Sequence, residues 1–121
     1  MDKYKLEERL IDFAVLIIKI AGSFEKNYAG NHLSSQIIRS GTSPALNYGE
    51  AQGAESTKDF IHKMGISLKE LRETFICIKI IEKASLITNS NDLQIAKAEA
   101  NELISIFVAS IKTAKTNLNN K

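Results

Sequence analysis

Residues 32–54 limit the fold of this chain more than any other stretch, because a helical residue pattern there contains the only proline, Pro44. A glycine or alanine at every fourth position would form a smooth ridge along such a helix: Gly41, Ala45, Gly49 and Gly53. An interior proline costs ~3 kcal/mol or more, and an interior glycine costs roughly 1 kcal/mol relative to alanine. We therefore expect a helix that persists only because neighbours pack on more than one side of it, with the small residues letting another backbone come close.

Two interpretations of this stretch remain open. A residue that precedes proline avoids the helical region of backbone space, so residues 41–44 could form a loop between two short helices. The favoured interpretation is one kinked helix, in which the carbonyl of Ser40 has lost its usual backbone donor.

Three further segments repeat apolar residues at alternating steps of four and three, which is the spacing of a helical-bundle seam. They span residues 3–24, 56–83 and 92–117. Ser56 and Asp59 have the spacing of a capping box, and Asn31 is expected to cap the proline-containing helix. Short turns at residues 26–30 and 85–90 separate the helices. The pattern predicts an all-α fold, an antiparallel up-down-up-down four-helix bundle with a proline-kinked second helix.

The first and last helices are apolar over a wider arc than one seam requires. The additional residues are Val15, Leu16 and Ile18 in the first helix and Ile104, Ile106, Val108 and Ile111 in the last. A stripe of this width is expected to contact two neighbouring helices or another subunit.

The composition is that of a single domain covering residues 1–121. The chain is 44% hydrophobic and 25% charged with a net charge of +2, and no apolar run is long enough to span a membrane. So small a net charge does not by itself predict nucleic-acid binding. The single cysteine, Cys77, cannot form an internal disulfide, which fits a reducing compartment. We expect a cytoplasmic protein with no membrane partner.

Polar side chains on the proline-containing helix and on the helix after it predict a structural polar layer between the two. Its members are Gln36, Arg39, Ser40, Ser43, Asn47, Glu50, Ser67 and Glu70. If Gln36 and Asn47 face inward, each needs partners, because a buried unsatisfied amide costs about 1–3 kcal/mol. The Ser40 carbonyl and the hydroxyls of Ser43 and Ser67 are candidate partners, and Arg39 would pair with Glu50 or Glu70. The alternative is that these side chains lie on a solvated face.

The sequence contains no residue pattern typical of catalysis or of cofactor binding. His32 and His62 lack the spacing of metal-ligand pairs, and there is no glycine-rich loop for phosphate. Cys77 lies in an apolar stretch, where a cysteine packs as a small hydrophobe. We therefore expect no enzymatic activity, no metal or other cofactor, and no small-molecule substrate.

The order and spacing of residues between positions 36 and 71 resemble those of a known family. The matching residues are Gln36, Arg39, Ser40, Ser43, Pro44, Asn47, Glu50, Ala51, Phe60, Ile66, Ser67, Leu68, Glu70 and Leu71. They are similar to the small four-helix-bundle proteins encoded in intervening sequences of bacterial large-subunit ribosomal RNA genes. The accessory protein of diversity-generating retroelements is a more distant relative. The resemblance implies an antiparallel four-helix bundle with a kinked second helix, assembly as a homopentamer, and no established catalytic activity.

Two compatible function hypotheses follow. The first is a non-catalytic, homo-oligomeric interaction module, whose subunits would meet through the surplus apolar surface and the glycine ridge. The second is an oligomeric accessory protein that binds the backbone of RNA or DNA through a line of cations on the third helix. The line lies within about 100° of arc and consists of Lys58, Lys69, Arg72, Lys79 and Lys83. The alternative for this line is an ordinary solvated face.

Overall fold

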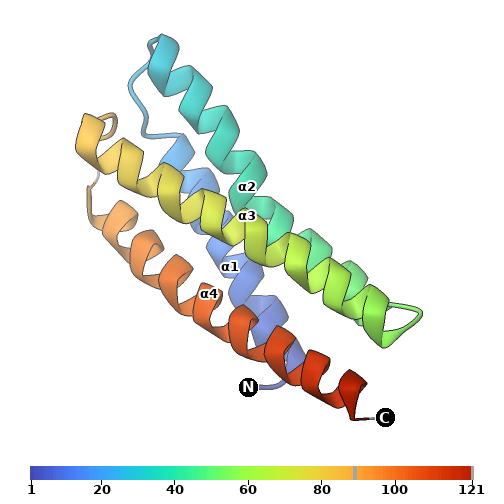
Figure 1. Ribbon diagram of the computed structural model, residues 1–121. Coiled ribbons are helices and arrows are strands. Elements are labelled where there is room, and N and C mark those ends of the chain that lie inside the picture. Colours follow the sequence, from blue (N-terminus) through green and yellow to red (C-terminus); the bar gives the residue numbers. More distant parts are fainter. Residues whose placement is uncertain (89, 121) are drawn as a thin grey trace.

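The computed structural model describes residues 1–88 and 90–120, most of which lie in four helices (Figure 1). The helices are α1 (Lys3–Ala21), α2 (Tyr28–Gln52), α3 (Thr57–Ala84) and α4 (Ser90–Asn119). Within the described residues there is no strand, and extended pairing is limited to an isolated antiparallel bridge between Phe24 and Ile87. The predicted all-α, four-helix fold is confirmed.

Each helix packs against the next one in the chain, and α1 also meets α4 (Figure 1). The loops after α1 and α3 lie together at one end, where the Glu25 N–H donates to the Leu86 carbonyl over 3.1 Å. Near the other end, the Tyr48 hydroxyl of α2 donates to the Lys3 carbonyl of α1 over 3.5 Å. Among the described residues, the backbones of α1 and α3 are not neighbours. These two helices therefore occupy diagonal corners of the bundle.

Side-chain caps fix where the helices begin. The Asn27 carboxamide oxygen accepts from the Gly30 N–H over 2.8 Å, so α2 begins one turn before the predicted cap, and the expectation that Asn31 caps it is wrong. Glycine allows this early start, because a Cβ on Gly30 would lie 1.9 Å from the Glu25 carbonyl oxygen. The predicted cap of α3 is confirmed, since the Ser56 hydroxyl accepts from the Asp59 N–H over 3.1 Å.

Aliphatic and aromatic side chains fill the space between the helices. The predicted seam of the first helix is buried throughout: Leu6, Leu10, Phe13, Ile17, Ile20 and, just beyond the helix end, Phe24. Phe107 of α4 meets Tyr48 of α2 edge to face, with ring centroids 5.9 Å apart. Because burying one large apolar side chain contributes roughly 1.5–3 kcal/mol, these residues supply most of the favourable free energy of folding.

α2 runs through Pro44 as a single helix, so the alternative of a loop at residues 41–44 is wrong. Gly41 and Pro44 are both buried. A Cβ built on Gly41 would lie 2.7 Å from Cγ2 of Ile17, so α1 crosses α2 at a point that only glycine leaves free. Packing at this crossing offsets the cost of helical glycine and proline. The kink of the helix stays a prediction.

Candidate interaction surfaces

Three buried hydroxyl groups join α2 to α3. The hydroxyls of Ser40 and Thr74 share a hydrogen bond of 2.9 Å, and the Thr74 hydroxyl also donates to the Glu70 carbonyl over 2.8 Å. One turn further along α2, the Ser67 hydroxyl donates to the Pro44 carbonyl over 3.2 Å. The sequence analysis missed Thr74. Thr74 lies seven residues after Ser67, so the two side chains share one face of α3. This spacing could have predicted that Thr74 belongs to the polar layer.

Arg39 forms the solvent-facing edge of this contact. Its guanidinium pairs with Glu70 over 2.8 Å and also with Glu73. The hydrogen bond and charge of Glu70, followed by those of Glu73, raise the pKa of Arg39. Arg39 is exposed, so the pair aligns the two helices more than it stabilises them.

Among the described residues, the other polar side chains of the predicted layer form no hydrogen bond from α2 to α3, so their predicted placement is corrected here. Gln36 and Glu50 are exposed, because their positions on α2 point away from the bundle interior. Glu50 has only a distant ion pair with Lys63, at 3.8 Å. The Asn47 amide donates within its own helix, to the carbonyl and the hydroxyl of Ser43 over 3.0 and 2.8 Å.

The small-residue ridge of α2 has two different ends. Gly41 lies against Ile17 of α1, and Ala45 is half-buried against the core. By contrast, Gly49 is exposed, with nothing within 4 Å of where a Cβ would be. Gly53 lies beyond the last helical residue and caps α2. Within one chain, then, only the first half of the ridge takes part in close packing.

A row of aliphatic side chains points outward from α1. Ile11, Val15 and Ile18 are 42%, 52% and 52% exposed. They lie opposite the buried seam of the helix, at positions four and three residues apart. Leu16, which the sequence analysis grouped with them, is instead half-buried against the core. The described residues leave this row, the α1 ridge, about half exposed.

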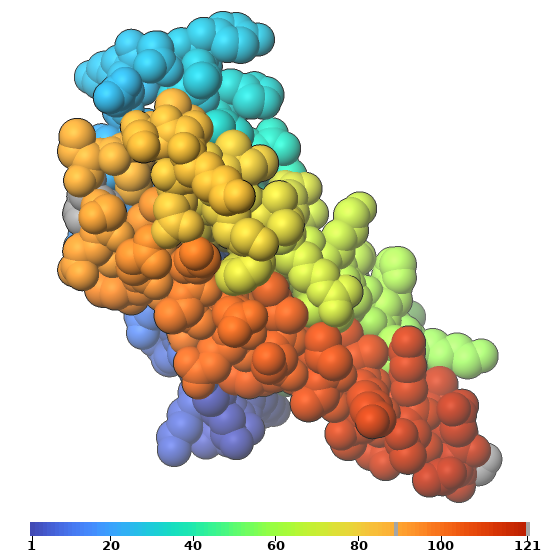
Figure 2. Space-filling model, turned by 60° about the vertical axis from the view of Figure 1, so that its left-hand side comes forward, coloured from blue at the N-terminus to red at the C-terminus, as the bar shows by residue number. Residues whose placement is uncertain are grey.

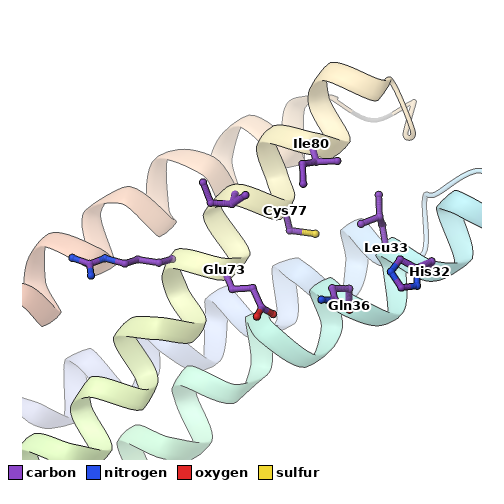
Figure 3. A pocket seen from close by; sticks show the side chains of 8 residues that line it. His32, Leu33, Gln36, Glu73, Cys77 and Ile80 are labelled. Atoms are coloured by element: carbon purple, nitrogen blue, oxygen red, sulfur yellow. The ribbon is translucent and has the colours of Figure 1, made fainter.

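A groove runs between α2 and α3 on the outer surface (Figure 3). It encloses about 410 Å³, and its apolar lining consists of Leu33, Ile76, Cys77 and Ile80. Four polar residues complete the lining: His32, Gln36, Arg72 and Glu73. Ile76 and Ile80 are 53% and 48% exposed. This α2–α3 groove is therefore another apolar surface that the described residues leave open.

The Cys77 side chain points into this groove from α3 (Figure 3). Burial, and to a smaller extent the charge of Glu73, raises the pKa of its thiol to about 11. At neutral pH the sulfur is therefore protonated and a poor nucleophile. The thiol contributes to the apolar lining of the groove.

All five cations of the predicted line on α3 are exposed. Within the described part of the chain none of the five forms an ion pair, although Lys79 lies 5.3 Å above the Phe75 ring. Arg72 also borders a groove of about 380 Å³ between α3 and α4, which Lys112 and Lys115 of α4 line from the other side. Figure 2 shows the face where these two helices lie side by side. The sequence analysis missed the α4 lysines because periodicity along one helix cannot relate it to another.

The described residues contain neither a metal-binding cluster nor a membrane-spanning helix. No group of three or more His, Cys, Asp and Glu side chains could hold a metal ion. None of the described helices combines the length and the apolar character required to cross a lipid bilayer.

Comparison with known proteins identifies similar sequences and structures. The sequence profile of the 23S rRNA-intervening sequence protein family matches residues 2–109. A solved crystal structure from Bacteroides thetaiotaomicron VPI-5482, described as a protein of unknown function from the S23 ribosomal protein family, is 29% identical. The match covers 93% of this chain and 99% of that one, with a TM-score of 0.82. No curated protein sequence matches the chain significantly.

Proposed function

The chain belongs to the 23S rRNA-intervening sequence protein family, and on that premise we propose that it is a non-catalytic helical bundle that assembles with copies of itself. The observation that carries the proposal is the α1 ridge, three aliphatic side chains about half exposed along one helix face. Contiguous exposed apolar side chains mark interaction sites on folded proteins. A closed assembly would cover them, and the family resemblance implies five subunits. The single cysteine, Cys77, fits a cytoplasmic assembly.

Light scattering coupled to size-exclusion chromatography tests this proposal directly. We expect the native chain to elute at a multiple of its 13.4 kDa monomer mass. A Val15→Asp variant should shift toward monomer, because a carboxylate would have to be desolvated in the interface. The matched control is Tyr28→Asp, which changes an exposed aromatic side chain at the start of α2, away from the ridge. A native chain that is monomeric at all concentrations would overturn the proposal.

We propose nucleic-acid binding as a second function, supported by the convergence of Arg72, Lys112 and Lys115 on one groove. Within the described residues these cations have no carboxylate partner. Cations on two adjacent helices could contact successive phosphates of an RNA or DNA backbone, and repetition in an assembly would strengthen a weak site.

A binding titration against salt tests the second function. Affinity for RNA should fall steeply as salt rises, because each neutralised phosphate releases counterions. A Lys112→Glu, Lys115→Glu double variant should lose binding, whereas Lys26→Glu, an exposed lysine in the loop before α2, should retain it. Binding that is insensitive to salt would exclude a backbone contact.

A further inference from the structure

Two hollows lie along the outer contact of α3 and α4, the pair of helices that Figure 2 shows side by side. The first is the groove of about 380 Å³ that Arg72 borders. The second encloses about 300 Å³ and is lined by Phe75 of α3 and by α4 residues that include Lys97 and Asn101. We call the two hollows together the α3–α4 furrow. It shares no residue with the α1 ridge, so a ligand in the furrow does not compete for the surface assigned to self-assembly.

The charge of the first hollow is of one sign. Arg72, Lys112 and Lys115 line it, and its lining includes no acidic residue. None of the three forms an ion pair with another described residue. Residues 103–121 contain three lysines and no acidic residue, so they account for the positive net charge of the chain. The ligand that complements this hollow is an anion.

The first hollow also has an apolar floor, which distinguishes between classes of polyanion. Leu68, Val108 and Ile111 line it among the cations, and Val108 is 41% exposed. A duplex presents its phosphates on the outside and keeps its base faces stacked inside, so it would contact the cations and leave this floor uncovered. An unpaired strand offers both a charged backbone and apolar base faces. The floor therefore favours a single strand.

An aromatic ring lies one helical turn from Arg72. Phe75 is half-buried and lines the second hollow, where Lys97 is neutralised by Glu82 over 2.9 Å. The ammonium of the exposed Lys79 lies 5.3 Å from the centre of the Phe75 ring. A nucleobase would replace this ammonium on the ring, and the released lysine would reach the adjacent phosphate. Aromatic rings beside cations hold single strands in proteins that bind them without reading the sequence.

Neutral hydrogen-bonding side chains complete the furrow. Thr116 and Asn119 line the first hollow, and Asn101 lines the second. Hydroxyl and amide groups placed among cations suit the ribose 2′-hydroxyl, which both donates and accepts and which distinguishes RNA from DNA. These side chains favour RNA as the occupant.

From these observations we propose that the α3–α4 furrow binds single-stranded RNA. Arg72, Lys112 and Lys115 contact its phosphates, and one base stacks on Phe75. This inference rests on the nucleic-acid function proposed above and names the class of nucleic acid that the site takes. Little sequence preference is expected, because the contacts are made to phosphates, ribose and base faces.

Fluorescence anisotropy with the native chain at low salt tests the strand preference. The labelled probes are an oligouridine, an RNA duplex of equal length, the corresponding oligodeoxyuridine, and an abasic ribose-phosphate strand. We expect the oligouridine to bind at least about fivefold more tightly than the abasic strand, because one stacked base contributes at least that factor. It should also bind more tightly than the duplex, although the duplex carries twice the charge, and more tightly than the deoxy strand.

A Phe75→Leu variant tests the ring itself. Its affinity for the oligouridine should fall at least about fivefold, and its affinity for the abasic strand should not change, because that strand has no base to stack. The matched control is Phe60→Leu, the same exchange at another half-buried position of α3 that lines neither hollow. The control should bind the oligouridine as the native chain does. Unchanged binding of the abasic strand also shows that the substituted chain remains folded.

The outcomes separate this inference from the proposed function. A duplex that binds as tightly as the oligouridine would overturn the single-strand assignment while salt-dependent binding of nucleic acid stands. A Phe75→Leu variant with native affinity for the oligouridine would do the same. Equal affinity for the deoxy strand would overturn the assignment to RNA. A native chain that binds none of the four probes at low salt would overturn both this inference and the nucleic-acid function.

Discussion

The hydroxyl groups of Ser40 and Thr74 are hydrogen-bonded over 2.9 Å in the buried interface between α2 and α3, one helical turn before Pro44. We expect Thr74→Val to lower the free energy of unfolding by about 1–3 kcal/mol, because the substitution keeps the shape and leaves a buried hydroxyl with a poorer partner. Urea denaturation measures the change. Thr113→Val, at an exposed position of α4, is the control and should alter stability little.

A double-mutant cycle tests whether the two hydroxyls act together. Ser40→Ala combined with Thr74→Val should cost less than the sum of the single substitutions, because the second change removes a group that the first has already left unpaired. Strict additivity would show that the bond contributes nothing specific.

Gly41 and Gly49, both on the small-residue ridge of α2, should respond in opposite directions to substitution by alanine. Gly41→Ala should lower the melting temperature, because its Cβ would lie 2.7 Å from Ile17 at the crossing of α1 and α2. Gly49→Ala should raise the free energy of unfolding by up to about 1 kcal/mol, because nothing lies within 4 Å of its Cβ position. Thermal unfolding at a fixed protein concentration measures both. Equal effects would mean that the two positions have the same surroundings.

The fold was predictable because it depends on patterns that lie within single helices. The residues of the predicted seam repeat at alternating steps of four and three and are all buried: Leu6, Leu10, Phe13, Ile17, Ile20 and Phe24. Ser56 caps α3 as its spacing from Asp59 predicts. Asn31 failed as a cap because the choice between it and Asn27 depends on Gly30 fitting beneath the Glu25 carbonyl, a contact that residue type alone does not disclose.

The surfaces were predictable only in part, because they are made by pairs of helices. The cations of α3 were visible in the sequence, but Lys112 and Lys115 join them only through the packing of α3 on α4. Likewise, Gln36 and Ser40 are four residues apart on α2, yet one is exposed and the other buried. That difference depends on how the helix is rotated against its neighbours, which periodicity leaves uncertain for a helix with few large apolar residues.

Cys77 should react slowly with alkylating reagents at pH 8. Burial raises the pKa of its thiol to about 11, against ~8.5 for an unfolded cysteine, so the folded chain carries at least about 100-fold less thiolate at this pH. The neutral thiol stabilises the fold fully below the unfolded pKa, and this contribution is lost as pH rises through the folded pKa. Mass spectrometry after iodoacetamide treatment, in buffer and in urea, measures the difference. Equal rates would contradict the buried, protonated thiol.

Arg9 of α1 should matter for stability because it holds α4 at the smallest helix–helix contact in the bundle. Its guanidinium donates twice to Glu99, over 2.7 and 2.8 Å, and pairs with Glu102 at 3.1 Å. Lysine keeps the charge but cannot form this two-pronged contact. We expect Arg9→Lys to lower the free energy of unfolding by about 0.5–1 kcal/mol, measured by urea denaturation. The control is Lys112→Arg, which exchanges the same two residue types at an exposed position and should leave the free energy of unfolding nearly unchanged. An unchanged midpoint for Arg9→Lys would mean that charge alone, without the paired hydrogen bonds, is enough to hold α1 against α4.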